Sequence, residues 1–113
     1  YTVDPRFGTE ADFRGLVDAC HARGLRVILD LAANHCSAEC PLFTAAQADP
    51  HDPHRGWFTF GPQYPHGYRT FFGVQSMPQF NLEDPGAEAF TCDVARHWLG
   101  GMGADGLRLD YAA

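Results

Sequence analysis

Two short apolar runs, Leu25–Leu31 and Gly106–Asp110, constrain the fold most strongly, because each follows a helical pattern that glycine ends. A continuous run of branched apolar residues is typical of a strand that is buried on both faces, as parallel strands are. The helical patterns cover 9–23 and 85–99. The resulting order of helix, strand, long connection, helix and strand predicts βα units, a parallel sheet and right-handed crossovers.

The two helices are predicted from capping residues and from apolar spacing. Thr9 with Asp12 three positions later has the pattern of a capping box, and Gly24 ends the first helix. Asp84 is the expected cap of the second helix, with Pro85 at its first position. The apolar stripes recur at helical spacing, with Phe13, Leu16, Val17 and Cys20 in the first helix and Phe90, Val94 and Trp98 in the second.

The long connection, residues 36–83, is rich in proline and aromatic residues, which is unusual for a structureless loop or a disordered linker. We interpret it as a small inserted subdomain, which divides the chain into 1–35, 36–83 and 84–113. Most of its rings are expected to form a local core, and the alternative is that they are platforms for a sugar or another flat ligand. The rings are Phe43, Trp57, Phe58, Phe60, Tyr64, Tyr68, Phe71, Phe72 and Phe80.

Charged and polar side chains stand at the ends of both predicted strands, an edge that carries the active site in α/β folds. Asp30 ends the first run, followed by Asn34 and His35. In the second run, strand alternation predicts that Arg108 and Asp110 share one face, where the guanidinium keeps the carboxylate ionised. A held, ionised carboxylate suits a nucleophile, and a structural ion pair explains the same two residues equally well.

Composition excludes some classes of function. The net charge of −6, with only 8 Lys and Arg, argues against a nucleic-acid partner, which requires clustered positive charge. No signal peptide and no membrane partner are expected, because the sequence has no charged-then-apolar leader and no apolar run of about 18 residues. Four cysteines without a C-x-x-C pair favour structural thiols over a metal site: Cys20, Cys36, Cys40 and Cys92.

Three segments resemble, in order and spacing, signature regions of the α-amylase family of glycoside hydrolases. They are Asp30–His35, Met77–Asn81 and Gly106–Asp110, and the resemblance extends over essentially the whole chain. The Met-Pro-x-x-Asn form, together with Trp57–Phe58 and Phe71–Gly73, is most similar to the neopullulanase, cyclomaltodextrinase and maltogenic amylase branch.

The resemblance implies part of a (β/α)8 TIM barrel, with 25–31 as its third strand, 106–110 as its fourth, and 36–83 as the small domain inserted after the third. A complete barrel needs roughly 200 or more residues, so we expect a fragment of the catalytic domain. The general-acid Glu and the second Asp of the family lie on later strands, outside these 113 residues. The chain alone is therefore expected to be inactive and poorly stable, with its apolar helix stripes and strand edges uncovered.

The resemblance also implies roles for four residues in a retaining glycosidase that acts on α-glucans. Asp110 matches the catalytic nucleophile, which forms a covalent glycosyl intermediate. Arg108 matches the arginine that holds it. His35 matches a residue that hydrogen-bonds the sugar at the cleavage subsite, and Asp30 matches an acid that supports this site from beneath.

No cofactor is certain from the sequence, although the resemblance allows calcium. Asn34 matches a calcium ligand of the calcium-dependent members, and Asn81 stands where some members have an Asp near that ion. Ala113 replaces the Lys that is common after the nucleophile in true α-amylases. Hydrolysis and transglycosylation, α-1,4 and α-1,6 preference, and cellular location stay open.

Two other functions compete with a catalytic one. A non-catalytic barrel relative could serve as a binding domain or a transporter partner, against which the presence of Asp110, Arg108 and His35 argues. An unrelated doubly wound domain could bind a small ligand, and the missing glycine-rich phosphate loop disfavours it.

Overall fold

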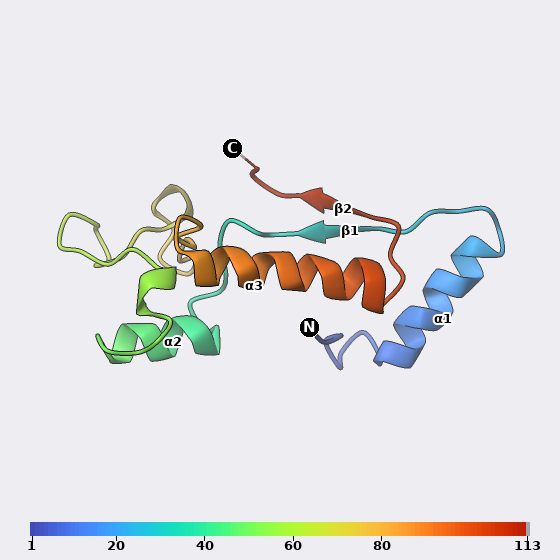
Figure 1. Cartoon of the computed structure of the whole chain (residues 1–113), viewed down its shortest axis with the longest axis horizontal. Coiled ribbons are helices and arrows are strands. Elements are labelled where there is room, and N and C mark those ends of the chain that lie inside the picture. The colour runs from blue at the N-terminus through green and yellow to red at the C-terminus, as the bar shows by residue number, and fades with distance from the viewer. Residues whose placement is uncertain (113) are drawn as a thin grey trace. The chain divides into compact units, whose positions relative to one another are not determined.

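The computed structural model describes residues 1–112 and divides them into two compact units (Figure 1). The first unit contains Tyr1–Leu31 and Cys92–Leu109, and the second contains Ala32–Thr91 and the residues from Asp110 onward. The unit boundaries fall after Leu31, Thr91 and Leu109, whereas the predicted limits were at 35/36 and 83/84. The division into barrel and inserted subdomain stays a prediction.

Strands β1 (Ile28–Leu31) and β2 (Gly106–Leu109) of the first unit lie side by side and run in the same direction (Figure 1). Their register pairs Ile28 with Gly106 and Leu31 with Leu109, which confirms the predicted parallel pairing. Strand β1 is shorter than the predicted run because Leu25 is bonded back to the end of the preceding helix and Val27 is bonded to Asp105 outside the strand ladder. At the end of that helix Gly24 has a φ of +73°, and the Leu25 N–H donates to the Cys20 carbonyl over 2.9 Å.

The prediction that both strands are buried on both faces is wrong for this chain. Ile28 is 65% exposed and Leu109 is 50% exposed. Among residues 1–112 the sheet has two strands, so each strand has an open edge and its apolar side chains are only partly covered. Leu16, on the apolar stripe of the first helix, is 56% exposed, which confirms the expectation of uncovered stripes.

Helix α1 (Glu10–His21) lies within the predicted 9–23, and its N-terminus is the expected capping box. The Asp12 N–H donates to Thr9 Oγ1 over 3.2 Å, while the Thr9 N–H donates to Asp12 Oδ2 over 2.8 Å. Two orphan amides are therefore satisfied at the start of the helix. In the first unit, α1 buries Val17, and Phe13 meets Trp98 edge to face at a ring separation of 5.3 Å.

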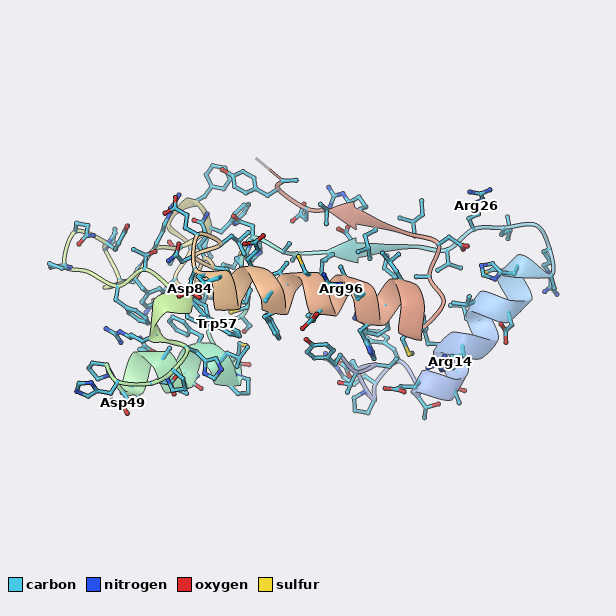
Figure 2. The ribbon with its side chains drawn as sticks, viewed as in Figure 1. Arg14, Arg26, Asp49, Trp57, Asp84 and Arg96 are labelled. Atoms are coloured by element: carbon cyan, nitrogen blue, oxygen red, sulfur yellow. The ribbon has the colours of Figure 1, made fainter. Side chains whose placement is uncertain are left out.

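Helix α3 (Pro85–Arg96) continues into a π-helical turn, His97–Gly101. Asp84 caps it by accepting from the Gly86 N–H over 2.8 Å. Figure 2 shows Trp57 and Asp84 near this N-terminal end, where the Trp57 ring lies 5.3 Å from that of Phe90. Among residues 1–112 no helix is long and apolar enough to cross a membrane.

The second unit has its own core, which confirms the expected local core of the inserted segment. Helix α2 (Pro41–Ala48), which the sequence analysis left within a loop, contributes Phe43 and Ala46. Phe58 and Tyr68 complete the buried cluster, and further partly buried residues pack against it: Cys36, Ala38, Cys40, Trp57, Phe60 and Phe80. Mutual burial of these aromatic rings removes their apolar surface from water, and this burial stabilises the segment.

Candidate active site

The first candidate group lies in the first unit, where the strand register places Asp30 opposite Arg108. Arg108 Nη1 donates to both carboxylate oxygens of Asp30, over 2.9 Å and 3.0 Å. Both side chains are largely exposed, at 66% for Asp30 and 60% for Arg108, so the pair contributes little to stability. The sequence analysis assigned Arg108 to Asp110 and did not foresee its bond to Asp30.

Asp110 follows β2 directly and is half-buried. The strand ends at Leu109, and the chain turns at once, because Tyr111 has a φ of +52°. That Asp110 shares a face with Arg108 stays a prediction, because Asp110 lies one residue beyond the end of the strand. Its role as nucleophile stays a prediction.

His35 lies in the second unit, half-buried and held on two sides. Its ring stacks on Phe71 at a centroid separation of 4.6 Å and an interplanar angle of 28°. Its backbone forms an antiparallel bridge with Gln79. On either side of it, the Phe80 N–H donates to the Asn34 carbonyl over 2.9 Å and the Cys36 N–H to the Pro78 carbonyl over 3.0 Å. The ring therefore has little freedom to move.

Phe71, Phe72 and Tyr111 form a second aromatic group, separate from the buried cluster. Their ring centroids lie 4.6 to 5.3 Å apart, with edge-to-face contacts. Phe72 is 77% exposed. Both Phe72 and Tyr111 have a left-handed backbone conformation, which residues other than glycine rarely adopt. The exposure of Phe72 shows that the core interpretation does not hold at this position.

Asn34 has its side chain in a hydrogen-bonded pair with Gln79, and this pairing was missed by the sequence analysis. Gln79 Nε2 donates to Asn34 Oδ1 over 2.9 Å, and Asn34 Nδ2 lies 3.4 Å from His35 Nδ1. The two amides line a polar hollow of about 590 Å³ together with Thr59, Arg69, Asn81 and Glu83. The one sequence signal for Gln79 was its position within the Met77–Asn81 motif.

A calcium ion requires six to eight oxygen ligands, and the assignment of Asn34 as one of them stays a prediction. The Asn34 oxygen faces the hydrogens of the Gln79 amide, and Asn81 Nδ2 donates to the Gly56 carbonyl over 3.0 Å. Arg69 and Glu83, whose formal charges are opposite, both line the same hollow. Within residues 1–112 no three His, Cys, Asp or Glu side chains are grouped so that they could hold a metal.

The cysteines of the described chain are free thiols. Burial against the aromatic cluster, with a smaller contribution from Cys40, raises the pKa of Cys36 to about 12. A thiol with so high a pKa is a poor nucleophile and a poor metal ligand. The structural role of Cys36, favoured because the sequence lacks a C-x-x-C pair, stays a prediction.

Comparison with known proteins decides the family. The model of the α-amylase catalytic domain matches residues 1–113. The chain belongs to the α-amylase catalytic domain family. Alpha-amylase 2 of Dictyoglomus thermophilum is 38% identical over 112 residues, which cover 99% of this chain and 19% of that protein. Neopullulanase 2 of Thermoactinomyces vulgaris is 36% identical, with 97% of this chain and 20% of that protein covered.

Solved structures of this family agree. The ligand-free cyclic alpha-maltosyl-(1→6)-maltose hydrolase of Arthrobacter globiformis superposes with a TM-score of 0.90 at 33% identity, covering 98% of this chain and 26% of that chain. The fold is therefore part of a (β/α)8 barrel, as the sequence analysis expected. This α-amylase family chain spans about a fifth of the length of the relatives named above. Ala113, the predicted departure after the nucleophile, lies outside the described residues.

Proposed function

We propose that this α-amylase family chain is part of the catalytic domain of a retaining glycoside hydrolase that acts on α-glucans. One observation carries the proposal: the family match runs through residues 1–113, and the signature segments contain the expected Asp, Arg and His. The two relatives named above, an α-amylase and a neopullulanase, have names that indicate α-glucan substrates.

In the proposed reaction, Asp110 attacks the anomeric carbon of the sugar. The glycosidic C–O bond breaks as a general acid protonates the leaving oxygen, and an ester to the Asp110 carboxylate forms. Water, or another sugar hydroxyl, then displaces the carboxylate and restores the original anomeric configuration. We assign the general acid and the second Asp of the family to residues outside this sequence, so the 113-residue chain alone is expected to be inactive.

Arg108 is proposed to keep the nucleophile ionised, since it stands two positions before Asp110 in the chain. Asp30 is proposed to hold the Arg108 guanidinium in position. The hydrogen bonds from Arg108 Nη1 to both carboxylate oxygens of Asp30 support this role. A guanidinium already held in place needs no reorganisation as charge shifts during the reaction.

His35 and the exposed aromatic group are proposed to bind the sugar. The ring nitrogens of His35 can hydrogen-bond hydroxyl groups, and the exposed face of Phe72 can pack against the apolar face of a pyranose ring. Both come from the second unit, in which Phe71 contacts the rings of His35 and Phe72.

Replacing the nucleophile in the complete protein tests the proposal. Asp110→Asn is expected to lower kcat for a maltooligosaccharide by on the order of 10⁴-fold, because the amide cannot form the ester. Asp18→Asn removes an exposed carboxylate of α1 and is the matched control, with kcat unchanged. A protein in which neither the wild type nor Asp110→Asn turns over α-glucans would instead support the non-catalytic alternative, a binding or transporter-partner domain.

A further inference from the structure

We propose that Gln79 is a positioning residue, which acts through Asn34 to fix the neutral His35 ring in one tautomer, with its proton on Nε2. The expected effect of Gln79 on glycosidase activity rests on the proposed function. The tautomer of His35 does not depend on that function.

Two hydrogen bonds connect the three side chains in a line. Gln79 Nε2 donates to Asn34 Oδ1 over 2.9 Å, and this bond accompanies the orientation of the Asn34 amide in the structure. The amide nitrogen of Asn34 then faces His35, and its Nδ2 lies 3.4 Å from the His35 Nδ1. All three residues are half-buried, so water competes only weakly for these groups.

The tautomer follows from what each group can donate. An amide nitrogen only donates, so with Asn34 in this orientation the His35 Nδ1 accepts and carries a lone pair. The proton of the neutral imidazole is then on Nε2. His35 therefore presents an N–H donor from Nε2, and a sugar hydroxyl oxygen would be its acceptor.

The backbone holds the line of side chains together before any ligand arrives. His35 and Gln79 are paired across an antiparallel bridge, although 44 positions separate them in the sequence. Stacking on Phe71 fixes the plane of the His35 ring at 28° to the phenyl ring. Packing thus sets the orientation of the His35 ring, and the amides of Asn34 and Gln79 determine which ring nitrogen carries the proton.

A carboxylate at position 79 would reverse the arrangement. The side chain of Gln79→Glu has only acceptor atoms when ionised, so it would repel Asn34 Oδ1 and favour a half-turn of the Asn34 amide. Asn34 Oδ1 would then face His35 Nδ1, and the ring proton would move to that nitrogen. Gln79→Met keeps the length of the side chain, removes the donor, and is expected to leave both tautomers populated.

The experiment measures the ring nitrogens of His35 by NMR in the complete protein labelled with ¹⁵N-histidine, with His35→Asn to assign the signal. We expect a protonated Nε2 in the wild type, a protonated Nδ1 in Gln79→Glu, and both in Gln79→Met. Gln47→Glu, which adds the same charge on the exposed surface of α2, is the control and should leave the wild-type tautomer unchanged.

Activity is measured on the same variants, where kcat/KM for a maltooligosaccharide should fall about tenfold in Gln79→Glu, the effect of one lost hydrogen bond. A wild-type ring protonated on Nδ1, or a tautomer that Gln79→Glu and Gln79→Met both leave unchanged, would overturn the inference. If Gln79→Glu does not fold, Gln79→Met decides. If the tautomers change as expected and no variant has glycosidase activity, the proposed function fails and the inference about Gln79 stands.

Discussion

Truncating Phe43 to alanine should open the second unit while leaving the first intact. Phe43 is 1% exposed, and its ring lies 4.7 Å from that of Tyr68 and 5.1 Å from that of Phe58. A buried Phe→Ala change costs roughly 3–5 kcal/mol, and each aromatic pair adds about 0.5–1.5 kcal/mol beyond the buried area. We therefore expect a loss near the upper end of that range, about 4–5 kcal/mol.

Hydrogen exchange with mass spectrometry on the complete protein measures this loss locally. A loss of about 4 kcal/mol corresponds to roughly a 10³-fold decrease in amide protection for peptides that cover α2. Phe7→Ala removes the same ring from a position that is 82% exposed and serves as the control, with protection of α2 unchanged. Equal, small effects of the two substitutions would refute the reasoning that this cluster holds the second unit together.

Three further predictions concern other parts of the chain. Hydrogen bonds from the Val27 N–H and, to a lesser extent, from His21 lower the pKa of Asp105 in the folded chain. The ionised Asp105 carboxylate therefore stabilises the fold fully above about pH 4, and this stabilisation is lost as the pH falls through the lowered pKa. Asp105→Asn should therefore lower the melting temperature at pH 7, and a gap to wild type that stays equally large at pH 3 would contradict this. Phe72→Ala should raise KM for a maltooligosaccharide about tenfold with little change in melting temperature, and an unchanged KM would rule out a sugar platform. Asn34→Ala should lower the melting temperature equally with and without EDTA, whereas a calcium ligand would show its effect only without EDTA.

The sequence predicted those features that depend on neighbouring residues or on simple periodicity. The capping box of Thr9 and Asp12 marks α1 because its hydrogen bonds are local. The parallel pairing of β1 and β2 follows from the helix between them. Helix α2 was missed because its cap, Cys40, makes no side-chain hydrogen bond, and Pro41 alone is a weak signal.

The candidate site was less accessible to sequence reasoning. The bond between Gln79 and Asn34 joins residues 45 positions apart, and no local pattern encodes such a contact. The left-handed backbone of Phe72 and Tyr111 runs against the preference of aromatic residues, so it is set by tertiary contacts. The exposure of Ile28 could not be read from its apolar run, since burial depends on the strands and helices that lie beside it.

Trapping the covalent intermediate tests the central claim most directly. The complete protein would be incubated with a fluorinated α-glucosyl fluoride that forms the glycosyl-enzyme quickly and loses it slowly, and its peptides would be mapped by mass spectrometry. We predict one added glycosyl group, on the peptide and at the carboxylate of Asp110. Labelling of a different carboxylate, by an enzyme that is nevertheless active on α-glucans, would contradict the assignment of Asp110 as the nucleophile.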